Sequence, residues 1–242
     1  MQVMLTGTDS VDFMVHGIFS YSFFGQRVWI TTTHVCLLIL VVSLIGFAMA
    51  AGHVLRKGAE VPGTFQNIVE MAAEALMKLE GSTMGRCAPG FYNYIGTILL
   101  FIGCCNISGL LGLRPPTADY GVTLPLAVIT FVLIHVNRIK NQRPSEIWKG
   151  LCSPLPPWLP LWVPVNVISE LAVPISLSLR LFANVLSGVI MLALVYGLLG
   201  WAAALWPAFL HAYFDLFSGA IQTYVFCMLT MTYLAAAAGG EE

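Results

Sequence analysis

A single charged residue lies inside the longest apolar run of this chain. Arg180 is the only lysine, arginine, aspartate, glutamate or histidine between Leu171 and Leu205. An arginine near the centre of a bilayer costs about 2.5–3.5 kcal/mol even on a lenient insertion scale. It cannot escape that cost by losing its proton, and the apolar residues on both sides extend too far for snorkelling. The residue therefore indicates either an ion pair within the chain that holds two helices together or a fixed cation in an ion pathway.

Further polar residues recur at helical spacing near the C-terminus. Asn184 follows Arg180 by four residues, so the two share one face of a helix. In the last apolar run, spacings of four, three and four residues would align a polar stripe on one face of an α-helix. Such a stripe serves either interhelical hydrogen bonding, worth ~0.6–2 kcal/mol per contact, or a water-accessible route toward Arg180. The members of the stripe are His211, Asp215, Ser218 and Gln222.

Two carboxylates flank this region in the chain. Asp215 supplies an exchangeable site on the last helix, and Glu170 precedes Arg180 by ten residues. Intramembrane carboxylates are candidates for proton relays. Because few carboxylates lie at the depth of Arg180, we expect a mobile carboxylate on another protein to meet it.

The composition indicates a membrane protein. The chain has 242 residues, of which 58% are hydrophobic and 10% are charged, against about 25% charged residues in soluble domains. The net charge of −1 suggests no nucleic-acid partner. The six cysteines form no CxxC pair or metal-ligand spacing, so we expect no metal and no cofactor.

The pattern of apolar runs predicts an all-α, polytopic membrane protein with five crossings and one amphipathic helix. The amphipathic helix is expected at 64–80, where apolar residues recur at helical spacing with charged residues between them. The last two runs are too long to stand upright, because 35 helical residues extend ~52 Å against about 30 Å of hydrocarbon. They must tilt steeply or bend, and Pro174 offers a place to bend. As one integral membrane domain, 1–242 divides into an outer N-terminal segment at 1–28, a first span at 29–52, the amphipathic inner-surface helix, a helical hairpin at 91–136 and a tilted helix pair at 163–238.

Basic residues predict the orientation. Two segments, one between the first and second spans and one after the third, carry most of the lysines and arginines, which places both inside. The N-terminus is then outside and the C-terminus inside, with Asp12, His16 and Asp119 on the outer side. The basic residues concerned are Arg56, Lys57, Lys78 and Arg86 in the first segment and Arg138, Lys140, Arg143 and Lys149 in the second.

Four segments of the chain resemble a known family. The run 164–184, PVNVISELAVPISLSLRLFAN, resembles the signature of subunit a of the F-type ATP synthase. The run 215–230, DLFSGAIQTYVFCMLT, is similar to the last helix of that family. The shorter segments 61–70, VPGTFQNIVE, and 116–124, PTADYGVTL, are similar to further family segments. The resemblance extends from about residue 10 to 236 and is closer to bacterial than to mitochondrial members.

The resemblance implies a non-catalytic, ion-conducting stator that presents two offset half-channels to the carboxylates of a rotating c-ring. The family's essential arginine falls on Arg180, its neighbouring amides on Asn184 and Gln222, and its outer ionisable residue on Asp215. The implied partners are the c-ring, the peripheral-stalk subunit b and the lipid bilayer. The implied location is the bacterial plasma membrane, with the mitochondrial inner membrane as the alternative. The candidate ion-translocation residues are Arg180, Asn184, Asp215, Gln222, Glu170 and His211, with Asp12, His16, Asp119 and Ser218 as further candidates for the outer half-channel.

One position departs from the family pattern. Nine residues after the arginine many members carry glutamate or histidine, whereas this chain has Val189. We therefore expect Asp215 or His211 to take a larger share of the outer route, with a proton or a sodium ion as the coupling ion. Two other classes stay open from the residues alone: an ion-coupled secondary transporter, and a purely structural membrane subunit. The transporter is disfavoured because the chain shows no paired repeats.

Overall fold

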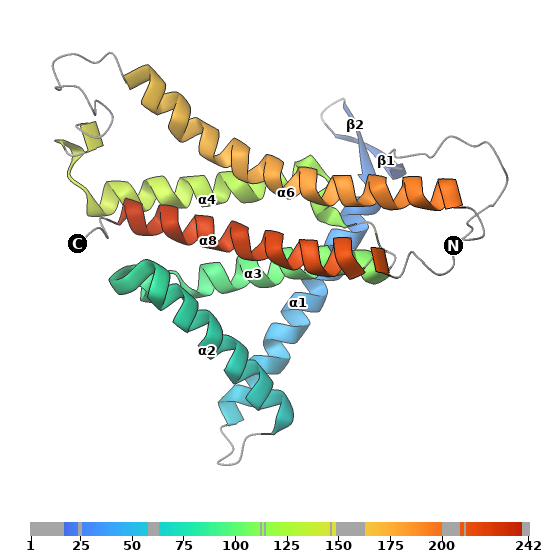
Figure 1. The fold of residues 1–242 in the computed structure, drawn as a ribbon, viewed down its shortest axis with the longest axis horizontal. Coiled ribbons are helices and arrows are strands. Elements are labelled where there is room, and N and C mark those ends of the chain that lie inside the picture. Colours follow the sequence, from blue (N-terminus) through green and yellow to red (C-terminus); the bar gives the residue numbers. More distant parts are fainter. Residues whose placement is uncertain are drawn as a thin grey trace.

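The computed structural model describes residues 17–23, 26–57, 63–111, 113, 115–145, 147–148, 163–199, 209–210 and 212–238. Its long helices form a bundle, with two further helices meeting in a V beside it (Figure 1). Five helical segments in the described part are long and apolar enough to cross a membrane, which confirms the all-α, polytopic fold. The bundle contains α3 (Tyr92–Ile107), α4 (Tyr120–Asn141), α6 (Val163–Leu199) and α8 (Gly219–Ala237), and the V contains α1 (Thr32–Lys57) and α2 (Thr64–Met84).

A small β-hairpin precedes the first span and was not predicted. Strands β1 (Gly17–Phe23) and β2 (Gln26–Thr31) pair antiparallel, with Tyr21 opposite Val28. The first span was expected to begin at residue 29, but β2 continues to Thr31 and α1 begins only at Thr32. The sequence VWIT at 28–31 consists of β-branched and aromatic residues, which favour a strand and also raise the hydropathy of a predicted span.

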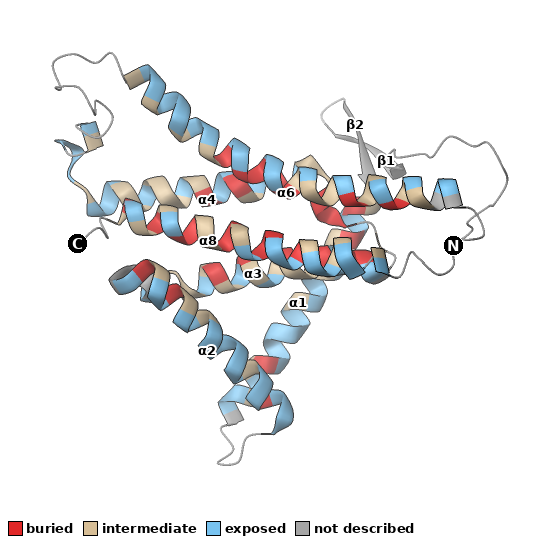
Figure 2. Ribbon diagram, in the orientation of Figure 1, coloured by how far each residue is buried: buried red, intermediate tan, exposed pale blue. Residues whose placement is uncertain are grey.

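Helix α1 presents its apolar side chains outward. Leu38 is 65% exposed and Val42 61% exposed, although the helix is the most hydropathic of the five spans. Figure 2 shows exposed positions along most of α1 and α2, and buried positions concentrated in the bundle. Apolar side chains that face outward along a whole helix are accommodated by lipid or by another membrane protein.

The core of the bundle lies around α8. This helix packs against α2, α3, α4 and α6, and its buried face carries Phe226 and Met231. The facing side chains include Ile95 and Ile102 of α3 and Leu181 of α6, all with no exposed area. Because α8 packs against four other helices, its polar residues Gln222, Thr223 and Thr230 are buried against protein.

The two C-terminal helices are irregular in ways that matter for the site. Helix α6 has 37 residues and so extends about 55 Å. Its N-terminal part diverges from α4 in Figure 1, and Pro174, which lacks a backbone N–H, lies within it. Residues Ala212–Ser218, labelled η6, form a π-helix immediately before α8. Single-turn π-segments inside helices are frequent at functional sites.

In the described part of the chain, short 3₁₀ segments connect some of the helices: η1 (Gly85–Gly90), η2 (Ser108–Leu111) and η3 (Pro116–Ala118). Gly85 ends α2 with a φ of 55°, a conformation that favours glycine. Asp119 caps the N-terminus of α4 by accepting a hydrogen bond from the Gly121 N–H at 3.0 Å. Helix α2 continues to Met84, four residues beyond the predicted range of 64–80.

Candidate functional site

Arg180 is exposed on the side of α6. Within the part of the chain that the structure describes, no hydrogen bond or ion pair joins its guanidinium to another residue. The chain therefore supplies no described partner for the ion pair that the sequence left open as one explanation. Among the described residues the permanent charge has no partner, so it is available to lipid or to a second protein along a membrane-spanning helix.

A hydrogen-bonded pair fixes the register between α6 and the last helix. The Asn184 Nδ2 donates to the Ser218 Oγ at 3.2 Å, and the Ser218 hydroxyl lies 3.3 Å from the Asn184 Oδ1. The two helices run antiparallel (Figure 1). One turn back from Asn184 is Arg180, and one turn forward from Ser218 is Gln222, so these two residues lie at the same level of the bundle.

Gln222 is only 7% exposed, and its Nε2 makes no hydrogen bond with any described residue. A buried amide nitrogen without a partner costs free energy comparable to a lost hydrogen bond. At the height of Arg180 along the bundle, α6 therefore presents an outward-facing cation. At the same height α8 presents an amide donor that has no hydrogen-bond partner among the described residues.

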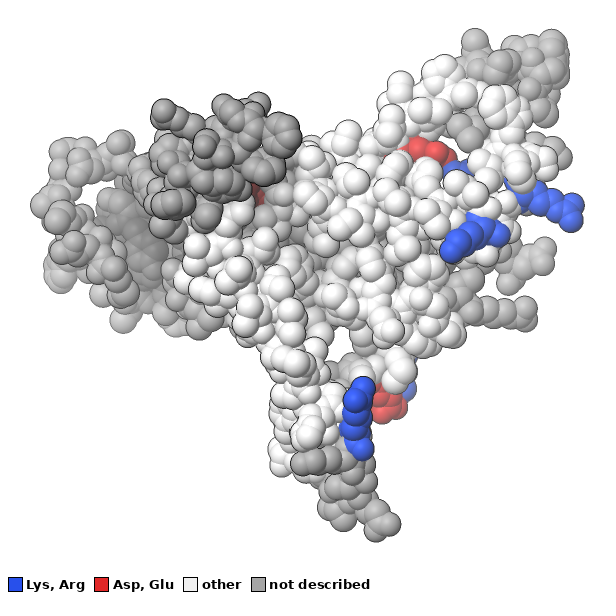
Figure 3. Space-filling view, turned by 180° about the vertical axis from the view of Figure 1, so that it is seen from behind, with Lys and Arg blue, Asp and Glu red and all other residues white. Residues whose placement is uncertain are grey.

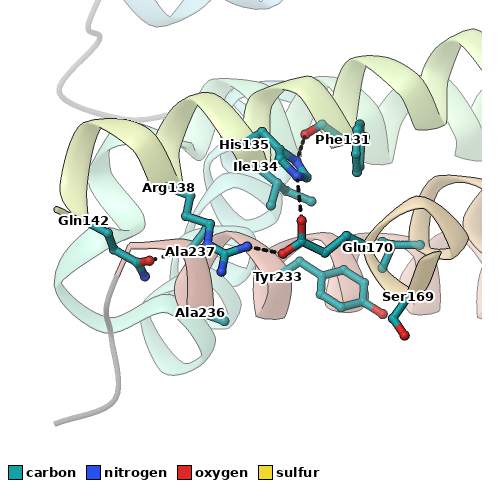
Figure 4. A pocket seen from close by; sticks show the side chains of 11 residues that line it. Phe131, Ile134, His135, Arg138, Gln142, Ser169, Glu170, Tyr233, Ala236 and Ala237 are labelled. Atoms are coloured by element: carbon teal, nitrogen blue, oxygen red, sulfur yellow. Dashed lines mark hydrogen bonds and ion pairs between the residues drawn. The ribbon is translucent and has the colours of Figure 1, made fainter. Parts of the chain in front are cut away.

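Glu170 lies on one side of this level. Ten residues of α6 separate it from Arg180, about 15 Å along the helix. Its carboxylate accepts a hydrogen bond from the Arg138 Nη1, and its Oε2 lies 3.4 Å from the His135 Nε2, both from α4 (Figure 4). Neither Arg138 nor His135 was among the site residues proposed from the sequence. The pattern that pointed to them is their spacing of three residues on one face of α4.

These residues line an open pocket of about 390 Å³ between α4, α6 and α8. Phe131 and Tyr233 form part of its apolar wall, and Glu170 and Arg138 contribute charged groups (Figure 4). The pocket lies at the end of α4 that carries Arg138, Lys140 and Arg143. Figure 3 shows most of the visible charged side chains at one end of the molecule and on its lower projection, with a broad uncharged surface between them. The pocket can therefore admit water from the basic end of the bundle.

Asp215 lies on the other side of the level of Arg180. It is half-buried in η6 and lines two pockets, the larger of about 220 Å³. Seven residues separate it from Gln222, about 10 Å along the helix in the direction away from Glu170. Its carboxylate is close to Gly109 in η2, where an added Cβ would lie 2.8 Å from the Asp215 Cγ. Arg180 lines neither the pocket of Glu170 nor the two pockets of Asp215.

A buried hydrogen-bond network centred on Asn106 supports this region and was not predicted from the sequence. The Asn106 Nδ2 donates to the Gly219 carbonyl at 3.0 Å and to the Thr223 Oγ1 at 3.1 Å. The Thr117 hydroxyl donates to the Asn106 Oδ1 at 3.2 Å. The network joins α3 to the junction of η6 and α8, and so fixes where the π-helix ends. The signal for this network in the sequence is a polar asparagine within an apolar span.

The π-helix corrects the predicted polar stripe. The stripe assumed regular α-helical spacing from His211 to Gln222, but Ala212–Ser218 have the wider i→i+5 pattern. Ser218 consequently contacts Asn184 on α6, while Asp215 lies beside Gly109 and Asn106. The polar residues are thus distributed between two neighbours and do not lie on one uniform face.

The remaining predicted residues contribute less to this geometry. Asp12, His16 and His211 lie outside the described residues. The Asp119 carboxylate acts as the cap of α4. Val189 is half-buried next to Gly188, whose Cα faces the Phe214 side chain, so this part of α6 is packed with apolar groups.

The family profile of the ATP synthase A chain matches residues 30–235. The chain belongs to the ATP synthase subunit a family. It is 32% identical over 245 residues to ATP synthase subunit a of Bacillus subtilis, covering 92% of this chain and 97% of the relative. It is 35% identical over 214 residues to ATP synthase subunit a of Anoxybacillus flavithermus, covering 82% of this chain and 89% of that one.

A third relative is the sodium ion specific ATP synthase subunit a of Propionigenium modestum, 35% identical over 198 residues. That match covers 75% of this chain and 66% of the relative. Membership of this family and the five apolar helices make the chain an integral membrane component of a bacterial-type ATP synthase, with a role in ion transport and ATP synthesis. The alternative of a secondary transporter is thereby set aside.

Proposed function

We propose that this chain is the ion-translocating stator of a rotary F-type ATP synthase and that it performs no bond chemistry itself. In this proposal it forms two offset half-channels that load and unload carboxylates of a neighbouring c-ring. The single observation that carries the proposal is the placement of two pockets on opposite sides of an exposed arginine. One pocket contains Glu170, the other contains Asp215, and Arg180 lies between their levels.

The outer half-channel leads to Asp215. An ion from outside reaches the pocket of about 220 Å³ around Asp215 and Asn106, and passes to a ring carboxylate near the level of Gln222. The unpaired Nε2 of Gln222 is a neutral donor that orients this carboxylate without trapping the ion. His211, Asp12 and His16 remain proposed contributors on the outer side.

The inner half-channel leads from the ring to Glu170. An ion leaving the ring enters the pocket of about 390 Å³, where Glu170, His135 and Arg138 converge. Glu170 and His135 both exchange protons, and Arg138 holds the carboxylate in place. The basic residues at the end of α4 support an inner position for this pocket, with the N-terminus outside and the C-terminus cytoplasmic.

Arg180 separates the two routes. Its charge faces outward at the level between the pockets, where it repels a cation that would pass directly from one half-channel to the other. It also favours the ionised form of an arriving ring carboxylate, which releases the ion. The driving force is the membrane potential, worth about 2.3 kcal/mol per elementary charge per 100 mV.

We propose the proton as the coupling ion. Two of the groups that converge in the inner pocket, Glu170 and His135, belong to side-chain types that carry protons in relays. The name of the Propionigenium modestum relative keeps sodium as the competing outcome. The remaining proposed partners are the peripheral-stalk subunit b and the bilayer lipids.

The test uses the whole ATP synthase in sealed vesicles. Arg180→Ala should abolish coupled ATP synthesis while the c-ring still co-purifies, and Arg180→Lys should not restore it, because lysine lacks the planar fork of arginine. ATP synthesis at a near-normal rate by Arg180→Ala would refute the proposal. Synthesis by the wild-type complex that needs sodium and resists a protonophore would replace the proton by sodium and leave the stator role intact.

A further inference from the structure

A second carboxylate on the inner side has no part in the route proposed above. Glu80 lies on α2, outside the five membrane spans, and its side chain has no exposed area. Both of its carboxylate oxygens are buried without a hydrogen-bond partner among the described residues. A buried carboxylate that is ionised and unpaired is so costly that the group takes up a proton instead. The ligand that suits this site is therefore a proton, because a bound proton needs no further coordinating groups.

The surroundings of Glu80 connect it to the channel helix. Helix α2 packs against α8, where the Thr83 hydroxyl lies 3.9 Å from the Met228 Sδ. The thiol of Cys227 on α8 is close enough to interact electrostatically with Glu80. Helix α8 is the same helix that carries Gln222, five residues before Cys227.

Among the described side chains, no basic group on α1, α2, α3 or α8 offsets the charge of Glu80. The segment η1 also packs against α2, and the side chains of its Arg86 and Cys87 lie outside the described part of the structure. On α8 the titratable neighbour is Cys227, and on α3 it is Tyr94, which interacts electrostatically with that thiol. On α2 itself Lys78 is exposed and pairs with Glu74 at 3.2 Å. Helix α1 meets α2 in the N-terminal half of α2, where Phe47 contacts Phe65.

We propose that Glu80 is a proton-binding latch: its neutral acid seals the contact between α2 and α8, and loss of the proton opens that contact on the inner side. The latch would respond to the inner pH and would control the packing of the helix that carries Gln222. It is separate from the ion route, since Glu80 lines none of the pockets around Glu170 or Asp215.

The direction of the pH dependence follows from the burial. Desolvation raises the pKa of the Glu80 carboxyl above its ordinary value of 4.5. A group with a raised pKa in the folded state stabilises that state fully below the ordinary value, and this stabilisation is lost as the pH rises through the raised pKa. The contact between α2 and α8 is therefore sealed at acidic pH and opens on the alkaline side.

The native thiol of Cys227 is the reporter. It has no exposed area while the contact is closed. In the intact ATP synthase, alkylation of Cys227 by a membrane-permeant maleimide is followed against pH by site-resolved mass spectrometry. The wild type should gain up to about tenfold in rate per pH unit beyond the gain of Glu80→Gln, because the glutamine cannot ionise. Comparison at equal pH cancels the increase in thiolate that both proteins share. The charge of ionised Glu80 opposes the neighbouring thiolate and so slows labelling of the wild type, which means that a faster wild type cannot come from that effect.

Controls separate the latch from general loosening. Glu74→Gln changes an exposed glutamate on the same helix and should keep the wild-type pH slope, and the buried Cys105 on α3 should label equally in the wild type and in Glu80→Gln. If Glu80→Gln does not assemble, Glu80→Met supplies an apolar side chain of similar length and should remove the extra slope. Equal pH slopes of the labelling rate in the wild type and in either assembled variant would overturn the proposal. Failure of both variants to assemble would also overturn it, because a neutral acid must be replaceable by a neutral side chain.

Discussion

Gly109 offers a way to move the Asp215 carboxylate without removing it. A Cβ at position 109 would lie 2.8 Å from the Asp215 Cγ and Oδ2 and 3.0 Å from its Oδ1. Ordinary contact begins at 3.4 Å, so in Gly109→Ala the carboxylate must retreat by about 0.6 Å. The backbone at Gly109 has no positive φ, and alanine is therefore tolerated there at no conformational cost. The perturbation acts on the position of one functional group.

The size of the effect follows from the sensitivity of transfer reactions to geometry. A misplacement of 1 Å can cost about a hundredfold in rate, so a retreat of this size should slow ATP synthesis roughly tenfold. The assay is ATP synthesis by the complete complex in vesicles under an imposed proton gradient, normalised to the amount of co-purified c-ring. Gly46→Ala on α1 is the matched control, because its Cβ would meet nothing within 4 Å and Gly46 lines neither pocket of Asp215.

A double-mutant comparison tests whether the loss acts through Asp215. Once the carboxylate is replaced in Asp215→Asn, adding Gly109→Ala should cause little further loss, since both changes act on the same group. A full rate in Gly109→Ala would show that the position of Asp215 is unimportant for transport. An equal loss in Gly46→Ala would show that the effect is a general one of adding a methyl group to a membrane helix.

Two further predictions concern the two half-channels. Arg138→Leu should slow ATP synthesis less than Glu170→Gln, because losing a partly exposed ion pair costs only up to about 1 kcal/mol whereas Glu170 is the proposed exchanging group; the reverse order in vesicle assays would make Arg138 the more important residue. Asp215→Asn should slow proton pumping far more than Val189→Ala, and adding Val189→Glu should restore part of the rate if the two positions face one cavity. Normal pumping by Asp215→Asn would transfer the outer role to other groups.

The sequence alone predicted the class of the protein and the charged residues of the candidate site. An arginine in an apolar helix and carboxylates on both sides of it in the chain are unusual enough to be visible without coordinates, because charge in a membrane is costly. The five spans follow from the length of apolar segments, which the thickness of the bilayer fixes. The start of the first span differs from the prediction, because at β2 and α1 strand-forming and membrane-spanning residues share the same composition.

The tertiary structure decided which polar groups meet. Regular spacing placed Asp215 and Ser218 on one stripe, but the π-helix separates them between α3 and α6, and no local pattern in the sequence marks that change. The grouping of Glu170 with His135 and Arg138, more than thirty residues apart in the chain, likewise depends on how α4 packs against α6. The same holds for Glu80, which reads as one more charge on an amphipathic helix and becomes buried only where α2 meets α8. Sequence spacing determines which side chains share a helix face. The packing of helices that are distant in the sequence determines which of those faces are buried, accessible to water or exposed to a partner.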